Sequence, residues 1–96
     1  MKKINLTAEM RRAVERCVWF ESPETAIEDI PRLAAYILTY GMPSDTASLL
    51  EQLGREGLKE VLDNAPAGIY DHRSWAYWNL MADRKDPPPL PQRHFD

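Results

Sequence analysis

The apolar residues of this chain recur at helical spacing along almost its whole length. Met10, Ala13, Val14, Cys17 and Val18 follow one another at the positions that share one face of a helix. No long run alternates polar and apolar residues, and no hairpin dipeptide of the Asn-Gly type is present. The sequence therefore predicts an all-α fold without strands.

Proline, glycine and capping residues divide this pattern into a compact array of about five short helices. We expect helices over about 8–18, 30–40, 43–53, 55–65 and 72–82, with a short helical turn over 23–28. Gly41 is predicted to end its helix with a left-handed backbone, and Gly54 to end the next helix. Connections this short make consecutive helices antiparallel or steeply crossed neighbours. The predicted N-caps are Thr7, Ser22, Asp29 and Asp71.

A chain of 96 residues has room for one domain. We assign residues 1–86 to a single helical domain and residues 87–96 to a proline-rich C-terminal extension. The extension cannot continue a helix, and we expect it to dock on the domain through Leu90 or Phe95. No apolar run is long enough to span a bilayer, no secretory signal is recognisable, and a single cysteine favours a cytoplasmic protein.

The charge of the chain is unevenly distributed. Residues 17–71 carry ten acidic side chains against three basic ones, a net charge of −7, whereas residues 1–16 carry five bases against two acids. The acidic middle would repel phosphate and favours a basic partner, with an ordinary solvated surface as the alternative. The basic first helix keeps open a second interpretation, a nucleic-acid-associated or transcription-related module that uses Arg11, Arg12 and Arg16.

The sequence offers little catalytic chemistry. It contains no phosphate-binding glycine loop and no paired His or Cys spacing for a metal, so we expect no catalytic residues, no cofactor and no metal site. His72 is interpreted as a polar residue in a first helical turn, and Cys17 as a small core residue. The chain is therefore predicted not to be an enzyme.

Large aromatic residues are numerous for a chain of this size. Most of Trp19, Phe20, Trp75, Tyr77 and Trp78 should fill the core, and one or two could anchor a partner. Trp78 is predicted to be a core residue. On the helix over 30–40, Leu33, Ala34, Ile37 and Leu38 form the apolar face, and Tyr36 and Tyr40 lie on its flank.

Four segments, WFESPET, AAYILTYGMPSD, LLEQLGREGLKEVLDNAP and RSWAYWNLM, give the chain a recognisable order of features. An aromatic pair is followed by an acid and Pro-Glu, then by a helix ending in Tyr-Gly, and a closing helix carries Trp78 near its centre. Over residues 19–82 the chain resembles small uncharacterised all-helical bacterial proteins often encoded beside nucleotidyltransferase-like toxins of abortive-infection type. The resemblance implies an antitoxin that binds and neutralises such a toxin.

A non-catalytic interaction protein is therefore the function that we expect, with a toxin encoded next to it as the protein partner. Neither a membrane nor, under this interpretation, a nucleic acid is expected as a partner, and a homodimer remains open. An acidic segment would face the basic cleft of the toxin. The residues expected to bind the partner are Glu21, Glu24, Glu28, Asp29, Arg73 and Tyr77.

Overall fold

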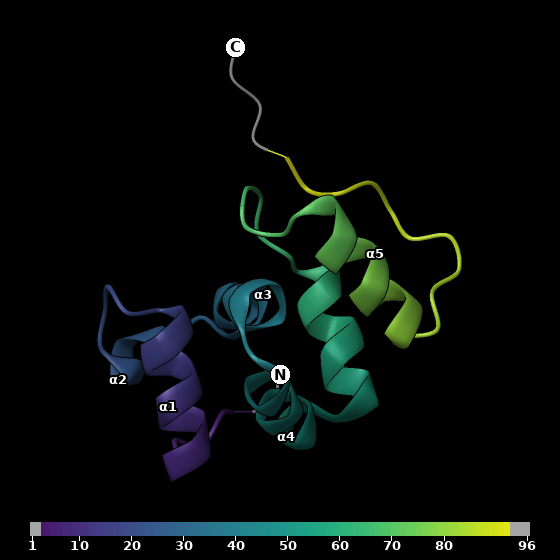
Figure 1. The fold of residues 1–96 in the computed structure, drawn as a ribbon. Coiled ribbons are helices and arrows are strands. Elements are labelled where there is room, and N and C mark those ends of the chain that lie inside the picture. The colour runs from purple at the N-terminus through teal and green to yellow at the C-terminus, as the bar shows by residue number, and fades with distance from the viewer. Residues whose placement is uncertain (1–2, 93–96) are drawn as a thin grey trace.

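A computed structural model describes residues 3–92, which form five α-helices (Figure 1). The helices are α1 (Ala8–Cys17), α2 (Pro23–Ala26), α3 (Ile30–Tyr40), α4 (Pro43–Asp63) and α5 (His72–Met81). No strand occurs between residues 3 and 92, so the predicted all-α fold is confirmed. None of the helices in this range combines the length and the hydrophobicity that a membrane span requires.

The four predicted N-caps are confirmed. In each case the side-chain oxygen of the cap accepts a hydrogen bond from a backbone N–H in the first helical turn. At α5 the N–H of Ser74 donates to Asp71 over 2.6 Å, and this bond lowers the pKa of the Asp71 carboxyl. Local sequence therefore decides where these helices begin, at Thr7, Ser22, Asp29 and Asp71.

Helix α4 contains the predicted break at Gly54. The two helices expected on either side of this residue form one element with a sharp bend (Figure 1). Gly54 has φ 69° and ψ −179°, a backbone conformation that is essentially restricted to glycine. The bend lets the two halves of α4 pack on different parts of the core.

The predicted left-handed conformation of Gly41 is wrong. Gly41 is extended, with φ −73° and ψ 155°, because the chain passes directly into the extended N-cap Met42 and the start of α4. The position requires glycine for a different reason, which is space. A Cβ atom there would lie 2.5 Å from the carbonyl oxygen of Ile37 and 3.1 Å from the Cβ of Asp45.

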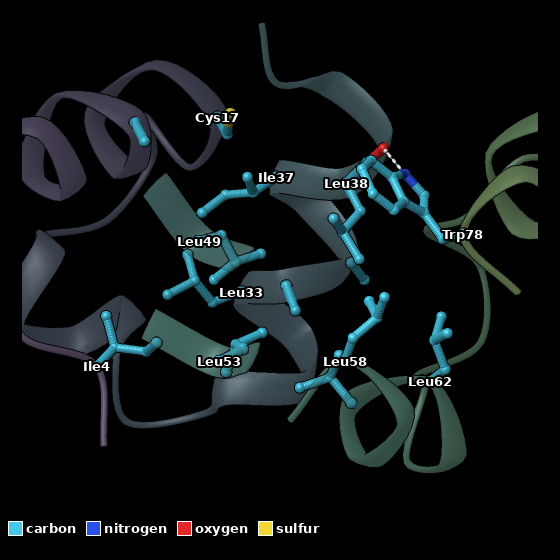
Figure 2. Packing of buried hydrophobic residues seen from close by; sticks show 14 of the residues in the cluster. Ile4, Cys17, Leu33, Ile37, Leu38, Leu49, Leu53, Leu58, Leu62 and Trp78 are labelled. Atoms are coloured by element: carbon cyan, nitrogen blue, oxygen red, sulfur yellow. Dashed lines mark hydrogen bonds between the residues drawn. The ribbon is translucent and has the colours of Figure 1, made fainter. Parts of the chain in front are cut away.

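Helix α3 lies at the centre of the fold and packs against α1, α4 and α5. Its buried residues are Leu33, Ala34, Ala35, Ile37 and Leu38. The surrounding helices contribute to the same buried cluster, and α4 contributes from both sides of its bend (Figure 2). These residues include Met10, Val14 and Cys17 of α1 and Leu49, Leu53, Leu58 and Leu62 of α4.

Helix α5 is attached to α3 by Trp78. This residue is 7 % exposed, which confirms its predicted place in the core. The indole Nε1–H donates a hydrogen bond of 2.8 Å to the carbonyl oxygen of Leu38 (Figure 2). Trp75, one turn earlier, is also buried and packs edge-on against Tyr70. Trp75 and Trp78 therefore both pack in the core and attach α5 to the rest of the domain.

The segment after α5 runs back over this helix. Trp75 Nε1–H donates to the carbonyl oxygen of Pro88 over 2.9 Å, and Leu90 packs against the buried cluster. Arg84 donates to the carbonyl oxygen of Lys59 and lies 2.6 Å from a carboxylate oxygen of Asp63. Phe95, the other residue expected to dock, lies outside the described residues.

Replacing Trp78 tests how far α5 depends on this contact. Trp78→Ala should lower the free energy of unfolding by about 3–5 kcal/mol, because it leaves a cavity and an unpaired buried carbonyl. Trp78→Phe keeps most of the apolar contact and should cost only about 1–3 kcal/mol. Urea denaturation measures both values. A loss below about 1 kcal/mol for Trp78→Ala would contradict a core role.

Gly41→Ala tests the steric explanation for glycine at this position. The added methyl group would overlap the carbonyl oxygen of Ile37, so the junction between α3 and α4 must shift. We expect a loss of about 1–3 kcal/mol in the free energy of unfolding, measured by urea denaturation. Stability equal to or above that of the wild-type protein would show that the junction has room for a side chain.

Candidate interaction surface

Four aromatic rings form a continuous strip on the surface between the end of α1 and α3. The ring centroids of Trp19 and Phe20 are 5.7 Å apart, those of Phe20 and Tyr36 5.5 Å, and those of Tyr36 and Tyr40 6.3 Å. The first two pairs meet edge to face, which is a favourable arrangement. We call these four residues the aromatic strip.

The aromatic strip is largely open to solvent. Trp19 is 79 % exposed, Tyr40 65 % and Phe20 46 %, while Tyr36 is half-buried. The buried cluster contains none of the three exposed rings. Large apolar rings gathered on a surface mark a contact site more often than single scattered ones do.

Arg32 braces the middle of the aromatic strip. Its guanidinium carbon lies 5.6 Å from the ring centroid of Phe20 and 5.4 Å from that of Tyr36, within the range of a cation–π contact. Its Nη1 also donates to Glu21 Oε1 over 2.6 Å. Glu21 thus fixes the position of Arg32, and Arg32 contacts the rings of Phe20 and Tyr36.

The sequence explains why these rings meet. Arg32, Tyr36 and Tyr40 are spaced four residues apart and therefore lie along one stripe of α3, on the flank of its buried face. Trp19 follows the C-cap of α1 in the turn toward α2. This turn and the stripe of α3 together form the aromatic strip.

The acidic residues predicted to bind a partner have several roles. Glu21 holds Arg32, and Asp29 caps α3. Glu24 pairs with Arg11 at 3.3 Å, in a contact that is open to solvent on both sides.

Glu24 and Glu28 also line one pocket of about 360 Å³, which we call the acidic pocket. It is lined by Lys3, Ile4, Glu24, Ile27, Glu28 and Ile30.

Arg73 and Tyr77 lie elsewhere, on α5. They line a pocket of about 350 Å³ between α5 and the junction of α3 with α4. Tyr77 is 53 % exposed and packs edge-on against Trp78. Helices α2 and α5 lie on opposite sides of α3 (Figure 1), so the structure does not bring the six predicted residues together.

Two of the three arginines of α1 are engaged within the chain. Arg11 pairs with Glu24, and Arg16 pairs with the buried carboxylate of Asp45. Arg12 is exposed. Of these pairs only that of Arg16 with Asp45 involves a buried carboxylate, since the contact of Arg11 with Glu24 is open to solvent.

Asp45 is a buried carboxylate that joins α1 to the start of α4. It is 3 % exposed and accepts hydrogen bonds of 2.9 Å from Arg16 Nη1 and from the backbone N–H of Met42. Cys17 lies next to this site and is buried, as predicted. Burial, followed by the negative charge of Asp45, raises the pKa of the Cys17 thiol to about 11.

Residues 3–92 contain no group of three or more His, Cys, Asp or Glu side chains arranged to hold a metal ion. No protein-family model, curated protein or solved structure matches the chain.

Sequence reasoning missed two of the four rings of the aromatic strip. Tyr36 and Tyr40 were placed correctly on the flank of their helix, but Trp19 and Phe20 were not distinguished from core aromatics. The available signal was the spacing of Arg32, Tyr36 and Tyr40 along one stripe on the flank of the apolar face. The contact of this stripe with the turn after α1 has no signature in either segment alone.

Alkylation of Cys17 tests the burial of this site. At neutral pH the thiol is protonated and enclosed, so iodoacetamide should label the folded protein far more slowly than the protein in urea. Mass spectrometry over time measures the difference. Equal labelling rates in the two states would show that the end of α1 opens freely.

Proposed function

We propose that this chain is a non-catalytic interaction protein that binds a protein partner through the aromatic strip. The observation that carries the proposal is the exposure of Trp19, 79 % open to solvent within a row of four contacting rings. Trp and Tyr are enriched among the residues that contribute most to binding at protein interfaces. The three exposed rings, Trp19, Phe20 and Tyr40, lie outside the buried cluster, so their contacts are available to a partner.

The internal bracing of the aromatic strip supports this proposal. Arg32 contacts Phe20 and Tyr36, and Glu21 fixes Arg32 by a short hydrogen bond. Side chains that are already held in place lose less conformational entropy when a partner covers them. Binding at such a surface therefore retains more of the favourable contact free energy.

Charge indicates which kind of partner fits. Glu21 compensates Arg32, and Asp45 compensates Arg16, so the arginines near the strip add little net positive charge. The segment 17–71 as a whole carries a net charge of −7. A partner with a positively charged surface would be attracted to this region and steered toward it.

The resemblance described above makes the partner more specific. The aromatic pair, the acid that follows it and the Tyr-Gly helix end include Trp19, Phe20 and Tyr40 of the strip, together with Glu21. We therefore propose that the protein is an antitoxin whose partner is a nucleotidyltransferase-like toxin encoded next to it. It would act by covering the basic cleft of the toxin, sterically and electrostatically.

Gel filtration with the products of the neighbouring genes tests this function. We expect a complex with one of them, and we expect high salt to weaken it because the surfaces carry opposite charge. Repeated absence of a complex with every neighbouring product would contradict the proposal. Binding to random duplex DNA with a steep salt dependence would instead favour the nucleic-acid interpretation.

Replacing Trp19 locates the interface. Trp19→Ala should raise the Kd of the complex by about 30-fold or more, equivalent to about 2 kcal/mol, because it removes an anchor ring. Leu80→Ala is a matched control, since Leu80 is 63 % exposed and lies on α5. It should change the Kd by less than about threefold. The opposite ranking of the two variants would place the interface on α5.

A further inference from the structure

We propose that the surface of α5 at Trp75 is a binding site for proline-rich segments, which the chain's own residues 87–92 occupy as a displaceable ligand. The ligand that replaces them is an extended segment of the pattern Pro-x-x-Leu-Pro, carried by a partner protein. Residues 87–92 run back along α5 (Figure 1), so this site is separate from the aromatic strip. The proposal therefore does not depend on the strip.

The sequence determines the conformation of the segment that occupies the site. Four of its residues are prolines, which fix φ at about −65°. Each proline also keeps the residue before it out of the helical region. The conformation that satisfies both restrictions is the polyproline II helix, which has about three residues per turn and no internal hydrogen bonds. The prolines are Pro87, Pro88, Pro89 and Pro91.

The burial of the segment follows a period of three residues. Pro87 and Leu90 are half-buried, whereas Pro88 and Pro89 between them are exposed. Leu90 packs against the buried cluster, and Pro91 beside it is half-buried as well. One edge of the segment therefore faces the domain, which is how a polyproline II ligand lies on an aromatic surface. The residues on this edge give the pattern Pro-x-x-Leu-Pro.

Trp75 contacts the backbone of the segment. Its Nε1–H donates a hydrogen bond of 2.9 Å to the carbonyl oxygen of Pro88. Proline has no N–H, so its carbonyl is the backbone group through which it can be bound, and an indole N–H is a donor that matches it. Trp75 is 5 % exposed, and Tyr70 packs edge-on against its ring at a centroid distance of 5.2 Å. The ring that binds the carbonyl is therefore held in place by the domain.

The segment can leave the site without unfolding α5. Arg84, just before it, lies 2.6 Å from Asp63 and is thereby attached to the end of α4. Within the described part of the chain, residues 87–92 are held by the hydrogen bond from Trp75 and the packing of Leu90. A minor open state of this kind typically makes up about 0.1–10 % of the molecules. In that state a partner segment has access to Trp75.

An NMR titration of the ¹⁵N-labelled full chain tests the site. The probe is the peptide acetyl-Lys-Asp-Pro-Pro-Pro-Leu-Pro-Gln-amide, which has the sequence of residues 85–92. We expect a saturable shift of the indole N–H resonance of Trp75, while that of Trp19 stays unchanged. No saturable shift at Trp75 would overturn the proposal. Because the two indoles report separately, failure of this proposal is distinguishable from failure of the aromatic strip.

Two control peptides test which features of the segment are recognised. One has serine in place of the leucine, and the other has alanine in place of the three consecutive prolines. Both should bind at least about tenfold more weakly than the probe, because the first loses the apolar contact and the second loses the preformed extended conformation. Equal binding of either control peptide would overturn recognition of the pattern Pro-x-x-Leu-Pro.

Two variants of the full chain test displacement. Leu90→Ser weakens the chain's own segment, so the probe should bind about tenfold more tightly to this variant than to the wild-type protein. Leu80→Ser makes the same change at a 63 % exposed position of α5 and should leave the wild-type affinity unchanged. An unchanged indole resonance of Trp78 is the control for an intact core in both variants. Equal affinities of the probe for all three proteins would overturn displacement.

Gel filtration over a range of protein concentrations tests the source of the ligand. We expect the same elution volume for the wild-type protein and for Leu90→Ser, since the ligand comes from a partner. A concentration-dependent dimer of the wild-type protein that Leu90→Ser abolishes would overturn the partner as the source. It would assign the site to residues 87–92 of a second copy.

Discussion

Enclosure of α3 by three other helices determines which of its residues can meet a partner. Helices α1, α4 and α5 cover it, and five of its eleven residues are buried. The stripe formed by Arg32, Tyr36 and Tyr40 remains outside this core. The open side of α3 therefore carries large aromatic rings, of which Tyr40 is exposed and Tyr36 half-buried.

The carboxylate of Asp45 fixes the two segments that carry the aromatic strip. Arg16, three residues before Trp19, donates to it from the end of α1, and Met42, two residues after Tyr40, donates from the junction of α3 and α4. A buried carboxylate needs such donors, because burial without them is costly. Gly41 allows the close approach that this arrangement requires. The hydrogen bonds of buried Asp45 thus hold the two segments that carry the exposed rings.

Features that depend on residues close together in the sequence could be predicted, whereas features that depend on distant residues could not. Caps such as Asp71 and the break at Gly54 depend on a few neighbouring residues, and these predictions are confirmed. The conformation of Gly41 was predicted wrongly because the start of α4 and Asp45 decide it. The aromatic strip joins residues 16 positions apart, and the pairing of Glu21 with Arg32 spans 11 positions. Neither contact has a local pattern from which it could have been derived.

Hydroxyl-radical footprinting of the free protein and of its complex tests most directly whether the aromatic strip is the interface. Aromatic and methionine side chains are oxidised when solvent reaches them, so covering them slows the reaction. The account predicts that oxidation of Trp19 and Tyr40 slows several-fold in the complex, while oxidation of Tyr77 and Met81 on α5 does not change. Protection of Tyr77 and Met81, with Trp19 still oxidised at its free rate, would contradict it.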